Sequence, residues 1–295
     1  MKKVISLALS IFVFLISSFS VFAVDVDHKS CGKTIVTIGD WVYEAINGGS
    51  YWELDEYIGS GGDVIVPRIV NDKMVVSIGS HCFLNNTTVK NVETSSPLWT
   101  VSDYAFLNCT SLESFECNFA LKEIGVGAFS GTSSLKRINL EDSVVSVISP
   151  HAFMSSGIEQ VELPETCTKI MHDAFSQCNN LEEIVIPRSV ETIENNAFSS
   201  SSKLKISCYK NSAAHNYAIN NGIDFRLLDE PLVGDANADG KISISDATAV
   251  QKYKAGLITL SKYGMVCADT NHDGQVTVRD ATLIQMRIAN IINEF

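Results

Sequence analysis

The sequence predicts an α+β protein, in which a β-solenoid with a parallel sheet is followed by a small all-α domain. The first observation behind this prediction is an internal period of about 23 residues between Val64 and Leu204. Units of that length cannot bury their apolar faces alone, so they stack on their neighbours and share one core. The second observation is a pair of twelve-residue loops rich in Asp, Asn and Gly, 34 residues apart, each followed by a helical segment.

Residues 1–23 are predicted to be a signal peptide. Two lysines precede an apolar run from Val4 to Phe22, and Ala23 completes a small-residue cleavage site. A membrane anchor is the alternative, but no basic stop follows the apolar run. An exported chain would be secreted and extracellular. Loss of Lys2 and Lys3 takes the net charge from −12 to −14, which disfavours nucleic acid as a partner.

Each predicted repeat is anchored by a small residue followed by Phe, and the successive Phe residues are 23, 23, 24, 22 and 23 positions apart. The anchors are Cys82-Phe83, Ala105-Phe106, Ala128-Phe129, Ala152-Phe153, Ala174-Phe175 and Ala197-Phe198. An Ile or Val stands five residues before each Phe, at Ile78, Val101, Ile124, Ile148, Ile170 and Ile193. An aliphatic residue stands five or six positions after it, at Val89, Leu112, Leu135, Ile158, Leu181 and Leu204. These positions are predicted to form the core.

A strand is predicted after each of these aliphatic residues, because in five repeats a further apolar residue follows three places on. Side chains alternate along a strand, so the residues between the apolar positions should point outward. One outward row reads Asn91, Ser114, Arg137, Gln160 and Glu183, and the other reads Glu93, Glu116, Asn139, Glu162 and Val185. Neither row contains an aromatic residue, which disfavours a glycan ligand and leaves a protein partner or plain solvent.

The cysteines allow two interpretations. Eight cysteines in an exported chain are typical of a disulfide framework. However, Cys109 and Cys178 stand three residues after the repeat Phe, where other repeats carry Asn, Thr or Ser, and Cys82 replaces the anchor Ala. The third position should form an inward polar ladder to neighbouring backbone, so these three cysteines are predicted to be core residues. The remaining five have no assigned role: Cys31, Cys117, Cys167, Cys208 and Cys267.

The phrase Ile170-Met-His-Asp-Ala-Phe175-Ser-Gln-Cys-Asn-Asn-Leu181, present in six variants, resembles the BspA-like leucine-rich repeats of bacterial surface proteins. The resemblance implies a leucine-rich repeat solenoid over residues 63–228, closed by a short helix and strand near Phe225. Residues 24–62 are predicted to form an N-terminal β-hairpin cap around Asn47-Gly48-Gly49. Residues 229–232 form a short linker to the final domain, residues 233–295, and should restrict its orientation.

The final domain carries the two loops, residues 235–246 and 269–280. All six aspartates of residues 233–295 fall at loop positions 1, 5 or 12, whereas chance surface turns would scatter some elsewhere. Calcium prefers roughly six to eight oxygen ligands, and this spacing supplies them, while Gly240 and Gly274 permit the sharp turn at position 6. The predicted ligands of two Ca²⁺ ions are Asp235, Asn237, Asp239, Asp246, Asp269, Asn271, Asp273 and Asp280 through side chains, Lys241 and Gln275 through carbonyls, and Ser243 and Thr277 through water.

Each loop has Asp at position 12 and runs into a helix, and no helix-length segment precedes Asp235. A duplicated loop–helix unit of this kind, a paired F-hand, resembles the calcium-binding type I dockerin module. That module docks proteins onto cohesin-bearing scaffoldins in cellulosomes. The resemblance implies that loop positions 10 and 11 and the following helix recognise the cohesin. These residues are Ile244, Ser245, Gln251 and Lys252 in the first copy and Val278, Arg279, Gln285 and Met286 in the second.

No catalytic arrangement is predicted. Outside the solenoid and the dockerin-like domain about 40 mature residues remain, fewer than a usual domain has. Their carboxylates, Glu44, Glu53, Asp55 and Glu56, lack the cleft that glycoside hydrolysis needs. The sequence therefore predicts a non-catalytic secreted subunit of a cellulosome, with the solenoid available for an unknown protein or glycan ligand. The alternatives are a polysaccharide-degrading cellulosome component and a cell-surface adhesin.

Overall fold

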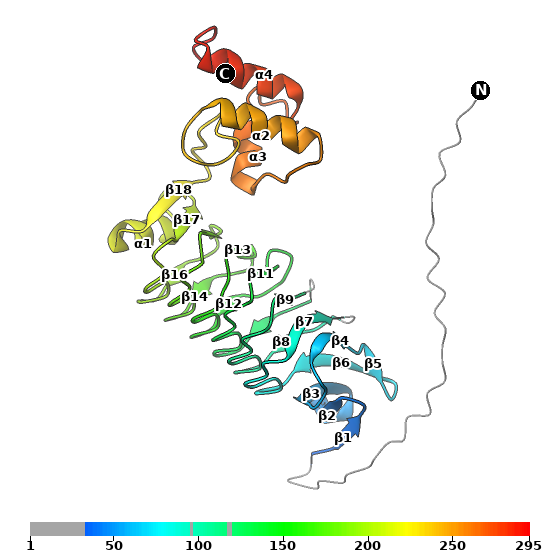
Figure 1. The fold of residues 1–295 in the computed structure, drawn as a ribbon. Coiled ribbons are helices and arrows are strands. Elements are labelled where there is room, and N and C mark those ends of the chain that lie inside the picture. Colours follow the sequence, from blue (N-terminus) through cyan, green and yellow to red (C-terminus); the bar gives the residue numbers. More distant parts are fainter. Residues whose placement is uncertain (1–32, 95–96, 117–119) are drawn as a thin grey trace, which may run out of the picture.

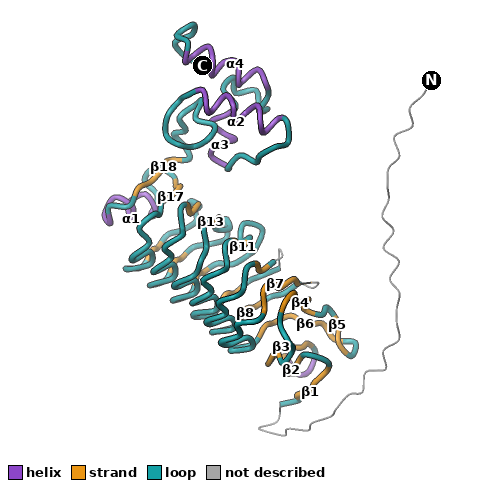
Figure 2. Tube along the Cα trace, viewed as in Figure 1, coloured by secondary structure: helices purple, strands orange, loops and turns teal. Residues whose placement is uncertain are grey.

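The computed structural model describes residues 33–94, 97–116 and 120–295, so the predicted signal peptide lies outside the described residues. An elongated parallel β-solenoid leads into a small helical domain at the C-terminal end (Figure 1). The prediction of an α+β protein with a parallel solenoid and an all-α final domain is therefore confirmed. Most helical residues lie in the final domain, and strands and turns make up the solenoid (Figure 2).

Two sheets run along the solenoid, whereas the sequence predicted one. The outward rows lie on an eight-stranded sheet composed of β4 (Gly62–Val66), β7 (Val89–Thr94), β9 (Ser114–Phe115), β11 (Arg137–Ile138), β13 (Gln160–Glu162), β15 (Glu183–Val185), β17 (Lys205–Cys208) and β18 (Asp224–Leu227). We call this the long-strand sheet. In register, Asn91 pairs with Ser114, Ser114 with Arg137, and Gln160 with both Arg137 and Glu183, which confirms the first predicted row.

The second sheet is formed by the Ile or Val that precedes each Phe, because this residue pairs with its counterpart in the next repeat. Its ten strands are β1 (Ile35–Ile38), β2 (Trp41–Ile46), β3 (Tyr51–Tyr57), β5 (Ile69–Val70), β6 (Lys73–Ile78), β8 (Thr100–Val101), β10 (Glu123–Ile124), β12 (Val147–Ile148), β14 (Lys169–Ile170) and β16 (Thr192–Ile193). The first three are antiparallel, and β2 and β3 are joined by the 3-10 turn Asn47–Gly49.

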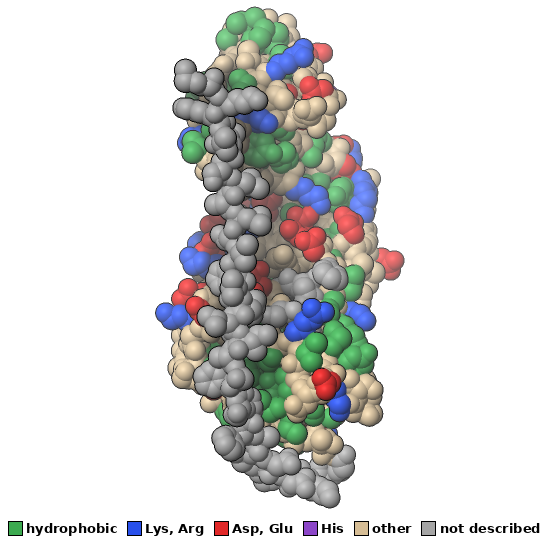
Figure 3. Space-filling model, turned by 90° about the vertical axis from the view of Figure 1, so that its right-hand side faces the viewer, with side chains coloured by type: hydrophobic (Ala, Val, Ile, Leu, Met, Phe, Trp, Pro, Cys, Tyr) green, Lys and Arg blue, Asp and Glu red, His purple; other side chains and the backbone are tan. Residues whose placement is uncertain are grey.

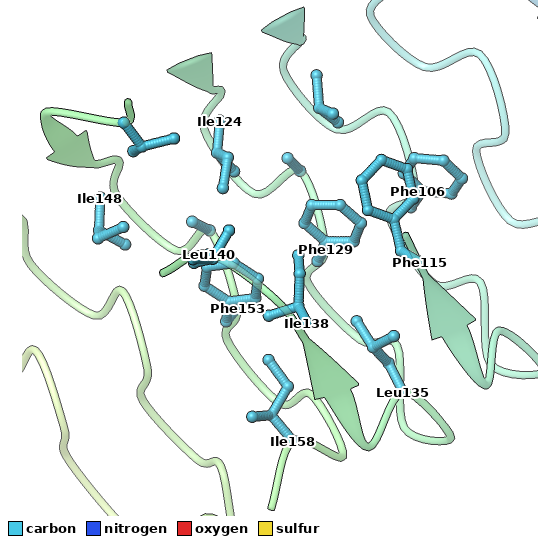
Figure 4. Close-up of a cluster of buried hydrophobic side chains, with 14 of the residues drawn as sticks. Phe106, Phe115, Ile124, Phe129, Leu135, Ile138, Leu140, Ile148, Phe153 and Ile158 are labelled. Atoms are coloured by element: carbon cyan, nitrogen blue, oxygen red, sulfur yellow. The ribbon is translucent and has the colours of Figure 1, made fainter. Parts of the chain in front are cut away.

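The anchoring Phe residues form a continuous stack through the core. Neighbouring rings lie 4.6–5.5 Å apart from Phe83 to Phe198, nearly parallel at 12° or less. The aliphatic positions on both sides surround this stack (Figure 4). All the predicted core positions are buried except Ile193, which is half-buried near the end of the array.

Two turn positions in each repeat adopt left-handed backbone, two residues before and two residues after the Phe. The first set comprises His81, Tyr104, Gly127, His151, Asp173 and Asn196, and the second comprises Asn85, Asn108, Gly131, Ser155, Gln177 and Ser200. This conformation turns amides toward the next coil, so Phe106 N donates to Ala128 O at 2.8 Å and Asn108 N donates to Ser130 O at 2.8 Å. The enrichment of Asn, Gly and His at these positions follows from their tolerance of positive φ.

Three of the six residues at the third position after the Phe form the predicted polar ladder, whereas Thr132 bonds Phe129 O of its own repeat at 2.7 Å. Cys109 Sγ donates to Phe83 O at 3.0 Å, and Cys178 Sγ donates to Phe153 O at 3.0 Å. Ser201 Oγ makes the equivalent bond to Phe175 O at 2.9 Å. Thiol and hydroxyl thus satisfy the same buried carbonyl of the preceding repeat. Cys82 is also buried, so the core assignment of all three cysteines is confirmed.

The C-terminal end of the solenoid carries α1 (Ala213–Asn221) and then β18, which adds to the long-strand sheet. The hydroxyl of Ser212 accepts a bond from His215 N and caps α1, and Gly222 ends it in the left-handed conformation at φ 64°. In the final domain α2 (Ile244–Lys254) packs against α4 (Val278–Ile288) around a core of Ala247, Val250, Ala281 and Ile284. A third helix, α3 (Lys262–Ala268), lies between them in sequence and was not predicted.

Candidate functional site

Each of the two predicted calcium loops closes on the carboxylate of its first residue. In the first loop Asp235 accepts bonds from Asp239 N and Gly240 N, both at 3.0 Å. In the second loop Asp269 accepts the equivalent bonds from Asp273 N at 3.1 Å and Gly274 N at 2.9 Å. Both glycines have positive φ, as the sharp turn requires. The two loops therefore share one backbone conformation.

The side chains at loop positions 3 and 5 follow the same pattern in both copies. Asn237 Oδ1 accepts from Asp239 N at 2.9 Å, and Asp239 Oδ1 accepts from Lys241 N at 2.9 Å. Asn271 and Asp273 repeat this arrangement at 3.0 Å and 2.9 Å. Side-chain oxygens of positions 1, 3 and 5 are thus folded back into the concave side of each loop.

The aspartates at position 12 lie in the first turns of α2 and α4. Asp246 Oδ2 accepts from Ser243 N at 2.8 Å, and Asp280 Oδ2 accepts from Thr277 N at 2.8 Å. Ser243 and Thr277 are the N-caps of α2 and α4, so each loop ends in a capping box. A carboxylate in the first turn also suits the positive end of the helix dipole. The predicted ligand at position 12 is therefore also the third helical residue, whose carboxylate completes the capping box.

The carboxylates of Asp235, Asp246 and Asp280 are fully buried. Burial raises the pKa of Asp235 above its usual value, and the nearby charge of Asp246 adds to this against the opposing bond from Gly240. Burial would also raise the pKa of Asp280, but the bonds from Thr277 and Thr270 together outweigh it and lower that pKa. None of the ion pairs between described residues involves a carboxylate of either loop. Buried, neighbouring carboxylates that form no ion pair fit a bound cation.

The loops are oxygen sites and not the kind that His or Cys would form. Within the described parts of the chain, no three His, Cys, Asp or Glu side chains cluster closely enough to hold an ion by themselves. The loop ligand set instead mixes carboxylate with amide, hydroxyl and carbonyl oxygens, as a hard cation prefers. Lys241 and Gln275, predicted to contribute carbonyls, are exposed at the mouth of the loops.

The residues implied for partner recognition lie at the surface of the final domain. Ile244 is 59% exposed and Val278 is 58% exposed, at the first turns of α2 and α4. The other predicted partner residues are also exposed, except for the half-buried Met286: Ser245, Gln251, Lys252, Arg279 and Gln285. Large aliphatic side chains that are exposed to solvent at equivalent positions of a duplicated module are typical of an interaction surface.

In the view of Figure 3 acidic and basic side chains are interspersed with hydrophobic ones over the visible surface. The two outward rows of the long-strand sheet are polar except for Val185. Near its C-terminal end this face meets α3 of the final domain. A cleft of about 540 Å³ opens there, lined by Arg137, Gln160, Glu162 and Glu183 on one side and by Lys262 and Tyr263 on the other. Lys262 Nζ bonds Glu162 Oε1 at 2.6 Å.

The linker between the two domains is held by the solenoid. Asp229 pairs with Arg188 at 2.5 Å and accepts from Lys210 N at 2.8 Å, and Glu230 pairs with Lys210 Nζ at 2.6 Å. Sequence reasoning expected a short, restricted linker but did not find these partners. They come from turns of the last repeats, and nothing in the local sequence marks them.

Two histidines lie on the turn edge of neighbouring repeats. The rings of His151 and His172 are 5.2 Å apart and meet edge to face, and His172 Nδ1 lies 3.2 Å from Glu194 Oε2. Lys169 pairs with the same carboxylate at 2.8 Å. This ion-pair group joins successive coils and contains no nucleophile.

The family comparisons agree with this geometry. A BspA type leucine rich repeat region matches residues 76–205 in six copies, and a dockerin type I domain matches residues 233–289. The chain therefore contains a BspA-type leucine-rich repeat region followed by a C-terminal type I dockerin domain, as the sequence motifs predicted. No curated protein matches the chain.

Solved structures of leucine-rich repeat proteins resemble part of the chain. A leucine rich repeat protein of T. pallidum is 20% identical, with 63% of this chain and 95% of that chain covered and a TM-score of 0.54, which supports the fold. A leucine-rich repeat protein from Bacteroides ovatus is 30% identical, with coverage of 59% and 45% and a TM-score of 0.49. A leucine rich cell surface protein from Faecalibacterium prausnitzii is 23% identical, with coverage of 59% and 54% and a TM-score of 0.47.

These domains define the class of protein. A dockerin implies binding to the cohesin of a cellulosome, type I dockerins bind calcium, and leucine-rich repeats imply interaction with proteins. Both are non-catalytic modules, and no catalytic domain was matched. None of the described helices is long and apolar enough to cross a bilayer.

Proposed function

We propose that this protein is a secreted, non-catalytic cellulosome subunit. Its dockerin binds the cohesin of a scaffoldin in a calcium-dependent manner, and its solenoid presents a polar face to a protein partner. The observation that carries this proposal is the pair of matching loop–helix units, whose buried carboxylates form no ion pairs while Ile244 and Val278 are exposed.

Calcium would be held by the loop oxygens of both copies. Asp235, Asn237, Asp239 and Asp246 would serve the first ion, with Lys241 through its carbonyl and Ser243 through water. Their counterparts 34 residues on would serve the second. Neutralising the clustered carboxylates stabilises the loop, and two of them, Asp246 and Asp280, lie in the first turns of α2 and α4. Ion binding is thereby coupled to the helices that carry the partner residues.

Cohesin binding tests the proposal directly. The purified mature protein should bind a panel of immobilised type I cohesins in millimolar calcium and dissociate when EGTA is added. Ile244→Asp combined with Val278→Asp should abolish binding, because charges would be buried in an apolar contact. The matched control, Ile65→Asp at an exposed position of β4 in the solenoid, should bind as the unmodified protein does. Binding that survives EGTA would refute calcium dependence.

The polar face supports a protein ligand over a polysaccharide. The outward residues of β7, β9, β11, β13 and β15 include no aromatic ring between their apolar positions. Incubation of the purified protein with cellulose, xylan and pectin should therefore give neither retention nor release of reducing sugar. Release of sugar would favour the polysaccharide-degrading alternative and exclude a purely structural role.

A further inference from the structure

The last strand of the solenoid reaches into the first calcium loop. Arg226, on β18, has a side chain only 9% exposed, and its guanidinium makes three contacts. One nitrogen lies 3.4 Å from Glu183 Oε1, the other donates to the carbonyl of Ala238, and the group stacks 4.1 Å above the ring of Tyr263. These partners belong to the long-strand sheet, the first loop and α3.

The hydrogen bond from Arg226 to the carbonyl of Ala238 affects the backbone conformation of the first loop. Ala238 is the fourth residue of the loop and has a φ of 65°, a conformation that alanine rarely adopts. A guanidinium bonded to its carbonyl favours this conformer before any ion arrives. The equivalent residue of the second loop, His272, has a φ of 56°, but among the described residues no side chain donates to its carbonyl.

The first loop is also covered by α3. A side chain at Gly264 would place its Cβ 2.5 Å from the carbonyl oxygen of Ala236, so helix and loop are in direct backbone contact. Tyr263 Oη accepts from Leu232 N at 3.0 Å, which ties the same helix to the linker. The first loop is therefore held from two sides. Asp239 to Lys241 are as exposed as their counterparts Asp273 to Gln275, so the two loops differ at the fourth position, where Ala238 is half-buried and His272 is exposed.

The charge of Arg226 is compensated within the solenoid. Glu183, its carboxylate partner, is also fixed by Ser207 Oγ at 2.5 Å. Pairing offsets the repulsion that a free guanidinium would exert on a divalent cation nearby. The hydrogen bond can then act through geometry, by removing conformational freedom that the loop would otherwise lose on binding.

We propose that Arg226 is a positioning residue through which the solenoid preorganises the first calcium loop. Calcium binding at residues 235–246 depends on the contact between the two domains, whereas residues 269–280 bind calcium independently. Because coupling is reciprocal, calcium in the first loop also strengthens the contact and fixes the dockerin on the solenoid. This inference rests on the proposed calcium binding.

Calorimetric titration of the full mature chain with calcium tests it. The unmodified protein should bind two ions. Arg226→Gln should lower the calcium affinity of one site by about tenfold and leave that of the other within about twofold of the unmodified value. Arg226→Lys, which keeps the charge but lacks the planar fork, should give an intermediate loss. Arg68→Gln, at an exposed arginine near the opposite end of the solenoid, should change the calcium affinity of neither site.

A second readout reports the domain contact without relying on affinity. In small-angle X-ray scattering, calcium should narrow the interatomic pair-distance distribution of the unmodified protein. The distribution of Arg226→Gln should remain broad at saturating calcium. Two unchanged calcium affinities in Arg226→Gln, or equal losses at both sites, would overturn the inference alone. No calcium uptake by the unmodified protein would instead overturn the proposed function on which it rests. Circular dichroism of each variant establishes that it is folded.

Discussion

Cysteine serves in this chain as a small core residue. The six described cysteines are all buried and unpaired, so the disulfide interpretation is wrong for them: Cys82, Cys109, Cys167, Cys178, Cys208 and Cys267. Burial raises the pKa of Cys109 to about 12 and that of Cys167 to about 11. Cys31 and Cys117 lie outside the described residues.

Thiol labelling should follow this burial. A raised pKa keeps the thiol neutral at pH 8, and the thiolate is the reactive form. In the native protein at pH 8, iodoacetamide should therefore leave all six described cysteines unmodified, and in concentrated urea it should modify all of them. Peptide mass spectrometry reads the result site by site. Native labelling of Cys109 or Cys178 would show that the ladder is open to solvent.

The core-facing residues could be predicted from the sequence, but the role of a residue without counterparts in other repeats could not. The 23-residue period makes the Phe stack and the ladder predictable, because equivalent positions of every repeat lie in the same environment. Arg226 has no such replicate. Its contacts with Glu183, Ala238 and Tyr263 join three separate segments, and only the packed structure brings them together.

At the level of elements, the solenoid depends on stacked rings. Phe129 lies between Phe106 at 5.2 Å and Phe153 at 5.5 Å and is fully buried. The apolar period alone does not predict the left-handed turns, because it carries no information on residues that tolerate positive φ. Asn85, Asn108 and Gly131 carried that signal at a constant distance from the Phe.

Truncation within the stack should be severe. Phe129→Ala should lower the free energy of unfolding by about 3–5 kcal/mol, because it removes a buried ring between two others. Arg137→Ala, at an exposed position of β11, should change it by less than about 0.5 kcal/mol. Urea denaturation followed by circular dichroism measures both. Equal, mild effects would contradict the repeat register.

The dockerin differs from the solenoid in what holds it together. Its core is small and built largely from alanines, with Val250 and Ile284 among the larger buried side chains. Buried aspartates stand at the start of α2 and α4, so the cation contributes to the stability of both helices. The solenoid core is a continuous apolar cluster from Trp41 to Ala218 and should be indifferent to calcium.

Removal of calcium should therefore unfold one domain. In the full chain with excess EGTA, the helical circular dichroism signal should fall, since three of the four described α-helices belong to the dockerin. The urea transition of the solenoid should remain within experimental error of its value in calcium. Helicity that is unaffected by EGTA would show that the dockerin folds without the ion.

At the scale of the whole molecule, the two halves of the dockerin are alike in fold but unlike in surroundings. The first half contacts the solenoid through the first loop, and α3 bonds Glu162 through Lys262. Among the described residues, no hydrogen bond or ion pair joins the second half to the solenoid. A module with internal two-fold symmetry is thus attached asymmetrically to the rest of the chain.

The recognition faces differ as well, and this predicts one dominant docking orientation. Ile244 and Val278 are equivalent and equally exposed, but Ser245 in the first half corresponds to Arg279 in the second. In the flipped pose a cation would replace a neutral hydroxyl, and a desolvated interface must pair that charge or bear the cost of leaving it unpaired. Cohesin binding by calorimetry should consequently be weakened very unequally by Ser245→Asp and Arg279→Asp. Two equal and mild losses, with failure only in the double variant, would show that the flipped pose is tolerated and that the dockerin binds in both orientations.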